Sequence, residues 1–423
     1  MNKQKIGFWF ENQALGDIDL SNPAEGNSGV GGTEYQFVLL AQLLISLHPQ
    51  HFDIYFFVEK DQELPSGINK VYASNLSEAY ALCAEKEIQF LVFRPRRDIT
   101  ESIRNIKLAS TKMIPWLHIT PKRQYLDWFV KNNLIHRVIF VGDDQRMRTC
   151  DHLVYGVSNT IYNASRGNFQ ISKNRRKDTV VFLGALVPRK GFHILAKAWN
   201  EVHKRYPSAK LNVIGSGILY DKSSKLGPLG IADSEYELQI SNLLGGPSGM
   251  KDKSVYFLGN LGKEKSSFIA DAKVGVVNPS GITENCPMSV VEFYEHGIPV
   301  ISSSKYGLRD MIIPRETGLL CRSSKQLSKA ILAFLNEEID SEELGRNGLS
   351  FAENKFSPQI IVNEWIEIFS GNFSESIHKK GYWVHKLFRI LKSAKLLPEK
   401  FPMVEDQKIY LAKARNQFLA IRK

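Results

Sequence analysis

Short apolar runs alternate with longer amphipathic segments along this chain, and one polar, basic stretch interrupts the alternation. Before the interruption, the apolar runs of strand length cover residues 6–10, 52–58, 90–93, 113–117 and 138–141. Two segments between them, residues 76–85 and 125–131, have the composition of helices. This strand–helix rhythm predicts a parallel, doubly wound sheet, because successive parallel strands need a helical crossover.

A second series of the same kind follows the interruption. Its predicted strands cover residues 180–183, 211–214, 255–258, 274–277 and 300–302. Its predicted helices cover residues 192–202, 236–244, 289–296 and 327–336. Two α/β units of similar size enclose a cleft, and clefts of this kind bind ligands.

We therefore divide the chain of 423 residues into four parts. They are an N-terminal Rossmann-like domain (1–164), a linker (165–178), a C-terminal Rossmann-like domain (179–355), and a closing helix with a basic helical tail (356–423). No apolar stretch reaches the ~18 residues of a membrane span. The four cysteines, none in a metal-ligand spacing, fit a reducing cytoplasm.

The net charge of +11 is concentrated at the C-terminal end. Residues 374–423 contain 12 Lys/Arg and 4 Asp/Glu, a net of +8, so the remaining chain carries only +3. Within this tail, residues 383–395 place apolar side chains on one helical face and basic ones off it. Such a segment suits an anionic membrane surface or packing against the first domain. Nucleic acid is not expected, since no helix-turn-helix, RNP or zinc-finger pattern occurs.

The loop between the predicted strand 274–277 and the next helix has the composition of an anion site. It runs from Asn278 through Glu284, and the helix begins near Met288, with Glu292 about one turn inside. Unpaired N–H groups at a helix N-terminus suit a diphosphate, and ionised carboxylates are strong acceptors for sugar hydroxyls. From spacing alone, the two glutamates could equally be a cap-region charge and a solvated helix residue.

This segment resembles the signature of family 4 retaining glycosyltransferases of the GT-B fold. The family pattern is Pro-Ser, a Glu, seven residues, a second Glu, and a helix that ends in Gly-x-Pro-Val. Here it runs from Pro279-Ser280 through both glutamates to Gly297-Ile-Pro299-Val300. The resemblance implies that Glu292 binds the donor ribose and Glu284 the transferred sugar. It also implies that the backbone N–H groups of Met288 and Ser289 face the diphosphate.

A second match is Phe182-Leu-Gly184-Ala-Leu-Val-Pro-Arg189-Lys190-Gly191. The family usually has an Arg directly after the first Gly and a Lys before the last one, and both neutralise the leaving diphosphate. Lys190 fits this pattern, whereas Ala185 replaces the Arg. Arg189 is offset by four residues and is either a substitute for that Arg or a solvated surface residue.

Further matches occur at strand ends. Gly31, Gly32 and Thr33 resemble the family's glycine loop over the reacting centre, although a tight turn and a helix cap explain them as well. His118 follows the strand 113–117 and matches a family His near the transferred sugar, or it is structural. The donor-side loops of the family are matched by Gly215, Gly259 and Asn260, which ordinary strand-end turns also explain.

The resemblance implies transfer of a sugar from a nucleotide-sugar donor to a glycan or lipid-linked acceptor, in bacterial cell-surface polysaccharide synthesis. We expect no cofactor and no metal, since no spaced Asp pair is placed for one. The expected location is the cytoplasm, with the tail as a candidate contact to the inner membrane face. Two alternatives stay open: a sugar-nucleotide 2-epimerase on the same fold, and a non-catalytic scaffold that binds nucleotide sugars. A Rossmann dehydrogenase is disfavoured, because Gly-x-Gly-x-x-Gly is absent after the first strand.

Overall fold

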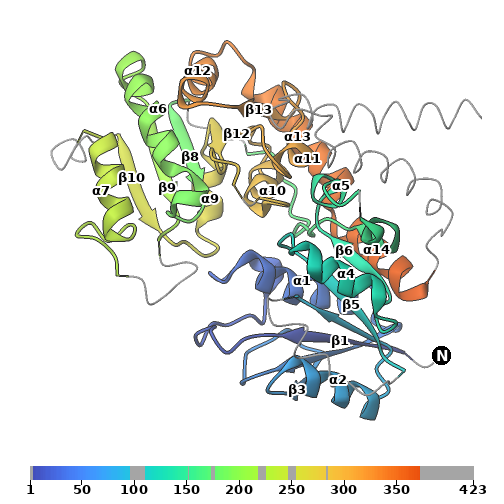
Figure 1. Cartoon of the computed structure of the whole chain (residues 1–423). Coiled ribbons are helices and arrows are strands. Elements are labelled where there is room, and N and C mark those ends of the chain that lie inside the picture. The colour runs from blue at the N-terminus through green and yellow to red at the C-terminus, as the bar shows by residue number, and fades with distance from the viewer. Residues whose placement is uncertain are drawn as a thin grey trace, which may run out of the picture.

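Two α/β halves form the structure, and each contains one parallel sheet (Figure 1). The computed structural model describes residues 3–95, 110–150, 152–172, 177–217, 225–245, 254–282 and 284–371. The basic tail from residue 374 onward, with its expected membrane contact, lies outside these residues. Among the described residues, no helix has the length and apolar character needed to cross a membrane.

The first half contains a seven-stranded sheet in the order β3-β2-β1-β4-β5-β6-β7. The strands are β1 (Gln4–Phe10), β2 (Phe52–Val58), β3 (Ile68–Tyr72), β4 (Phe90–Phe93), β5 (Lys112–Leu117), β6 (Val138–Phe140) and β7 (Ser158–Thr160). Its helices are α1 (Gly32–Leu47), α2 (Leu76–Glu85), α4 (Arg123–Lys131) and α5 (Asp143–Met147). All neighbouring strands are parallel, and the strand order reverses between β1 and β4.

The second half contains a six-stranded parallel sheet in the order β10-β9-β8-β11-β12-β13. The strands are β8 (Thr179–Leu183), β9 (Lys210–Ile214), β10 (Val255–Gly259), β11 (Val274–Val276), β12 (Val300–Ser303) and β13 (Gly318–Cys321). The helices are α6 (Phe192–Arg205), α7 (Ser234–Leu243), α9 (Lys265–Ala270), α10 (Met288–Glu295), α11 (Leu308–Met311), α12 (Ser324–Leu335) and α13 (Ser341–Phe356), and α14 (Pro358–Ser370) follows them in the chain. The order reverses between β8 and β11, so ligands are expected at the carboxyl ends of these two strands.

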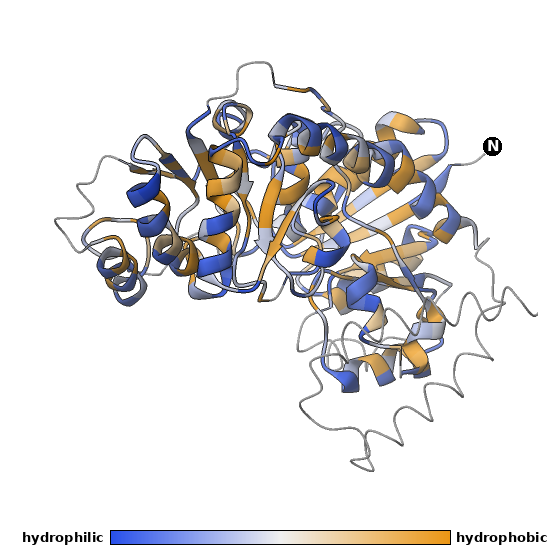
Figure 2. Cartoon of the chain, turned by 90° about the horizontal axis from the view of Figure 1, so that it is seen from above, coloured by the Kyte–Doolittle hydropathy of each residue, from blue (hydrophilic) through white to orange (hydrophobic). Residues whose placement is uncertain are grey.

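The two sheets share one of their apolar cores. Along β1, Phe8 and Phe10 point into one core, whereas Trp9 points into another on the opposite face. Along β8, Val181 joins the core of Phe8, and Phe182 belongs to a third core. Because side chains alternate along a strand, both faces of each sheet are covered, and the apolar strands lie inside (Figure 2).

The last described helix, α14, returns to the first half. Trp365 packs edge-on against Trp116 of β5 with ring centroids 5.0 Å apart. The carbonyl oxygen of Phe369 accepts a hydrogen bond from Gln4 of β1 at 3.2 Å. The chain therefore crosses between the halves twice, once through the linker and once through α13 and α14.

The predicted strands and helices agree with the observed ones to within a few residues, and the expected α/β class with two doubly wound Rossmann-like sheets is confirmed. The prediction missed the strands β3, β7 and β13 and the helices α5, α9, α11 and α13. β3 is an edge strand whose side chains are largely exposed, and β7 is only Ser-Asn-Thr. Edge strands of this kind form through pairing with a neighbour and carry little apolar signal of their own.

A buried ion pair attaches the linker to α10. Arg166 donates from its Nε and Nη2 atoms to Glu295 Oε2 at 3.2 and 2.7 Å, and its backbone N–H donates to Oε1 at 3.0 Å. The side chains are only 8% and 1% exposed, respectively. Burial raises the pKa of Glu295, and the Arg166 charge opposes that shift.

We predict that Glu295→Ala destabilises the fold strongly, because it leaves the Arg166 guanidinium buried without its carboxylate. Removal of one partner of a buried pair costs about 3–5 kcal/mol. Urea denaturation measures this loss. Glu201→Ala is the control, since it breaks an exposed pair with Arg205 and should cost about 1 kcal/mol or less. Equal losses in the two variants would contradict the prediction.

Candidate functional site

The loops that follow β8 and β11 pack directly against each other at the reversal point of the second sheet. Gly191 has a left-handed backbone (φ 73°), and a Cβ atom there would lie 2.5 Å from the Ser280 nitrogen. The Ser280 hydroxyl donates to the carbonyl oxygen of Arg189. Glycine at position 191 is therefore required for this loop to reach the loop after β11.

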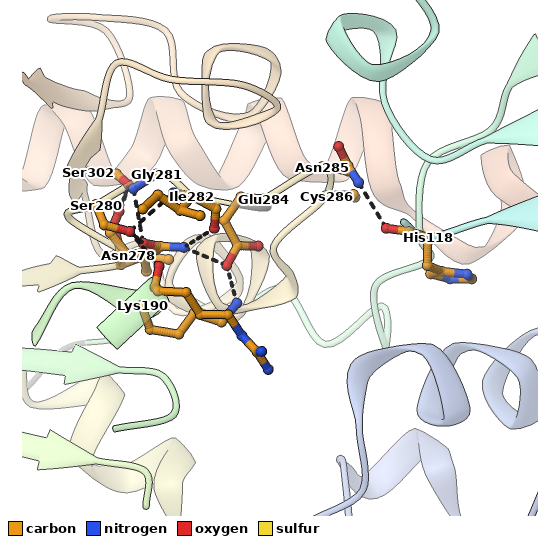
Figure 3. Close-up of polar contacts among 12 residues, drawn as sticks. His118, Lys190, Asn278, Ser280, Gly281, Ile282, Glu284, Asn285, Cys286 and Ser302 are labelled. Carbon is orange, nitrogen blue, oxygen red and sulfur yellow. Dashed lines mark hydrogen bonds and ion pairs between the residues drawn. The ribbon is translucent and has the colours of Figure 1, made fainter. Parts of the chain in front are cut away.

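Asn278 organises the loop after β11. Its Nδ2 donates to Glu284 Oε1 at 2.8 Å, and its Oδ1 accepts from the Gly281 N–H at 3.0 Å. Lys190, from the other loop, forms an ion pair with the same Glu284 oxygen. The Glu284 and Lys190 side chains are 9% and 17% exposed. The predicted residues Lys190 and Glu284 thus meet, with Asn278 as a third member that the sequence prediction did not include (Figure 3).

The helix α10 begins directly after this loop. Its first residues are Met288 and Ser289, and Pro287 precedes them as the N-cap. Glu292 lies one turn further on and pairs with Lys265 of α9 at 2.8 Å. Lys265 has no recognisable signal in the sequence, since it stands in a polar Lys-Glu-Lys stretch. The two predicted glutamates are therefore both paired with a lysine.

The predicted glycines of the second half meet at the strand ends. The Gly184 N–H donates to the Ile214 carbonyl at 3.0 Å, and the Gly215 N–H donates to the Gly259 carbonyl at 2.8 Å. A Cβ atom at Gly215 would lie 2.0 Å from the Gly184 oxygen, so this approach requires glycine. Asn260 is exposed just beyond, and Arg189 is exposed beside Lys190.

The predicted glycines of the first half lie at the start of α1. Gly31 is the N-cap and the helix begins at Gly32, so Thr33 lies inside the helix and does not cap it. Glu34 pairs with Arg94 at the end of β4, with a distance of 2.6 Å. The glycine loop therefore lies beside a partly buried ion pair that the sequence prediction did not include.

His118 follows β5 and is enclosed by aromatic rings. Its ring lies 4.6 Å from that of Trp116 and 6.1 Å from that of Phe37, between centroids. Both ring nitrogens are shielded from solvent without a hydrogen bond of good geometry. Burial lowers the pKa of His118 to about 3; the Arg94 charge adds to the shift, and nearby Asn163 opposes it.

A small hollow lies between the two halves beside α10. It is lined by Asn27, Tyr35, Ala164, Arg166, Lys265, Met288, Val291, Glu292 and Glu295. The four charged groups in this hollow are paired, Arg166 with Glu295 and Lys265 with Glu292. Among the residues that the structure describes, no group of three or more His, Cys, Asp or Glu side chains is arranged to hold a metal ion.

Comparison with known proteins agrees with this architecture. Residues 165–351 match the family described as "Glycosyl transferases group 1", so this part of the chain is a domain of that family. An uncharacterized glycosyltransferase of Haemophilus influenzae is 23% identical over 371 residues, which cover 79% of this chain and 95% of the relative. The capsular polysaccharide biosynthesis glycosyltransferase CapM of Staphylococcus aureus is 26% identical, over 58% of this chain and 62% of CapM.

Among solved structures, Anabaena Alr3699/HepE in complex with UDP superposes with a TM-score of 0.63 at 16% identity, over 87% of this chain and all of that one. At this identity the likeness establishes the fold alone. The chain has the GT-B fold, as expected.

We predict that His118 makes stability depend on acidity. Its folded pKa of about 3 lies below the ordinary value of 6.5, so the unfolded chain takes up the proton first. Its contribution is fully present above pH 6.5 and is lost as the pH falls from 6.5 toward 3. In urea denaturation from pH 7 to 4, His118→Gln should therefore lose less stability than the original chain. His51→Gln, at an exposed position, controls for the loss of a histidine; an unchanged slope in His118→Gln would contradict the prediction.

Proposed function

We propose, with the group 1 glycosyltransferase domain of residues 165–351 as the premise, that this chain moves a sugar from a nucleotide-sugar donor to an acceptor hydroxyl and retains the anomeric configuration. One observation carries the proposal. Lys190 and Glu284 meet at the reversal point of the second sheet, immediately before the N-terminus of α10. A cation, a helix N-terminus and a carboxylate are the groups that a sugar diphosphate needs there.

We assign each group a role from its chemistry. The N–H groups of Met288 and Ser289 face the diphosphate, because the first N–H groups of a helix have no partner within the helix. Lys190 neutralises the leaving diphosphate, and Arg189 is the candidate for a second cation. Glu292 accepts hydrogen bonds from the donor ribose, and Glu284 accepts them from the transferred sugar.

The remaining predicted site residues are the glycines at the strand ends and the residues of the first half. Gly184, Gly215, Gly259 and Asn260 lie on the donor side. Gly31, Gly32 and Thr33 lie at the start of α1, across the cleft, and His118 faces the transferred sugar as a neutral ring. Such a ring donates or accepts one hydrogen bond without adding charge.

The reaction breaks the bond between the anomeric carbon and the diphosphate oxygen. The acceptor oxygen bonds to that carbon on the same face, and its proton passes to the departing diphosphate. Positive charge fixed beside the diphosphate stabilises the charge that develops there. No metal is required in this scheme, and closure of the halves excludes the water that would hydrolyse the donor.

We infer the acceptor class from chemistry and from relatives. A glycan or a lipid-linked glycan of a bacterial cell-surface polysaccharide fits, since CapM is named for capsular polysaccharide biosynthesis. UDP-sugars are the first donors to test, because the Anabaena protein was solved in complex with UDP. The expected location is the cytoplasm, at the inner membrane face if residues 374–423 bind anionic lipid.

Two other functions remain to be distinguished from sugar transfer. A sugar-nucleotide 2-epimerase would convert the donor without an acceptor, and a scaffold would bind it without turnover. Ala185, in place of the arginine that the family resemblance implies, is the feature that favours the scaffold.

We expect the purified chain to consume a nucleotide sugar only when an acceptor is added, and to do so equally in EDTA. Nucleotide-sugar panels with and without acceptor glycans, followed by release of nucleoside diphosphate and by NMR of the new linkage, measure this. Conversion without acceptor would support the epimerase, binding without turnover the scaffold, and an inverted linkage would contradict retention. Activity lost in EDTA and restored by Mg²⁺ or Mn²⁺ would contradict the metal-free scheme.

We predict that Glu292→Ala and Lys190→Ala affect different quantities. Glu292→Ala should weaken donor affinity by about 1.5–3 kcal/mol, or roughly 10- to 100-fold, as a lost charged hydrogen bond does. Lys190→Ala should lower kcat more than donor affinity, because its charge matters most as the diphosphate leaves. Calorimetry and steady-state kinetics separate the two effects.

Arg189→Ala is the comparison variant for Lys190→Ala, since it removes the neighbouring cation. An unchanged kcat and donor affinity would mean that Arg189 does not substitute for an arginine at position 185. Equal loss of kcat and affinity in Lys190→Ala would reduce Lys190 to a binding residue.

A further inference from the structure

The side chain of Asn285 crosses from the second half of the molecule to the first. Its Nδ2 donates to the carbonyl oxygen of His118 at 2.9 Å (Figure 3). Its Oδ1 accepts from Arg148 Nη2 at 2.6 Å. Asn285 is only 6% exposed. Both polar atoms of this amide are therefore bonded to the other half.

The backbone of Asn285 also packs closely against its neighbours. A Cβ atom at Gly142, in the first half, would lie 2.8 Å from the Asn285 carbonyl oxygen. A Cβ atom at Gly307 would lie 1.8 Å from the same oxygen. The Gly307 N–H also donates to the Glu284 carbonyl at 3.1 Å. Two glycines thus leave room for this loop to lie against the first half.

Arg148 extends the seam, by which we mean the line of contacts between the two halves around Asn285. Its Nε pairs with Asp144 Oδ2 at 3.0 Å, and its guanidinium lies 4.9 Å from the centre of the Tyr306 ring. The Asp144 N–H donates to Asp310 Oδ2 of α11 at 2.7 Å. The contact of Asn285 therefore belongs to an ordered seam and is not an isolated surface bond.

We propose that Asn285 is a positioning residue for the transfer reaction, and this rests on the proposed function. It directly follows Glu284 in the sequence and bonds to the backbone of His118. It thereby fixes the distance between the carboxylate in one half and the imidazole in the other. Donor binding uses groups that we assign to the second half, so it does not need the Asn285 contact. Transfer needs a closed site that excludes water and is formed by both halves, so it does need this contact.

The test uses the full chain and two variants. Asn285→Ala removes both contacts. Asn285→Asp keeps the size and the acceptor for Arg148 but has no N–H for the His118 carbonyl. We expect kcat for transfer to fall about 10-fold or more in Asn285→Ala, since one of the lost hydrogen bonds is charge-assisted, and donor affinity to change about 3-fold or less. The smaller fall is expected in Asn285→Asp.

A structural readout accompanies the kinetics. Small-angle X-ray scattering should show a larger radius of gyration for Asn285→Ala, and hydrogen exchange should increase in both residues 113–118 and 284–290. Asn200→Ala is the control: it removes an exposed amide-to-carbonyl hydrogen bond to Leu243 inside one half. It should change neither kcat nor the scattering curve.

The outcomes separate this proposal from the proposed function. An unchanged kcat in both Asn285 variants, or equal losses of kcat and donor affinity with unchanged scattering, would overturn the positioning role. If the original chain transfers no sugar with any donor, the proposed function fails. Scattering and hydrogen exchange then still decide whether Asn285 holds the halves together, and unchanged values would overturn that role as well.

Discussion

In a parallel sheet, the loops that follow the strands all emerge at one edge, and the arrangement of this molecule depends on that constraint. Each sheet reverses its strand order once, between β1 and β4 and between β8 and β11. At such a reversal, the two neighbouring loops diverge to opposite faces and leave a crevice. The loops that contain Lys190 and Glu284 come from β8 and β11, so the topology brings together residues 94 positions apart.

The second constraint on the structure is that buried charges need partners of opposite charge. Glu284, Glu292 and Glu295 are all poorly exposed, and each is paired with a cation: Lys190, Lys265 or Arg166. An unpaired carboxylate in these positions would cost several kcal/mol. The pairs Lys190–Glu284 and Lys265–Glu292 lie where we propose that the donor binds. Its phosphate oxygens could replace a glutamate as the partner of a lysine, and its hydroxyl groups could replace a lysine as the partner of a glutamate. The pair Arg166–Glu295 holds the linker on α10 and lines the hollow between the two halves. The site and the connection between the halves are therefore built from the same helix.

The two halves meet through two kinds of contact, apolar packing and hydrogen bonds. Apolar packing continues from β1 through α10 to α14 in one shared core. Polar contacts concentrate around Asn285, Arg148 and Asp310. Apolar packing has little directional preference, whereas hydrogen bonds fix a relative orientation. This division suits a molecule whose halves must close in one defined arrangement.

The sequence by itself determined the fold class and most strands and helices, because buried parallel strands are continuous apolar runs and their crossover helices are amphipathic. It also offered Lys190, Glu284, Glu292 and His118 as candidates, because the segments that contain them resemble the motifs of family 4 glycosyltransferases. Only the tertiary structure decided which of these side chains touch. Lys265, Asn278 and Arg148 had no local signal, because a charged or amide side chain in a polar stretch looks the same whether it is solvated or buried. The edge strand β7 and the bridge made by Asn285 likewise depend on partners far along the chain, and such pairing is set by topology and not by local composition.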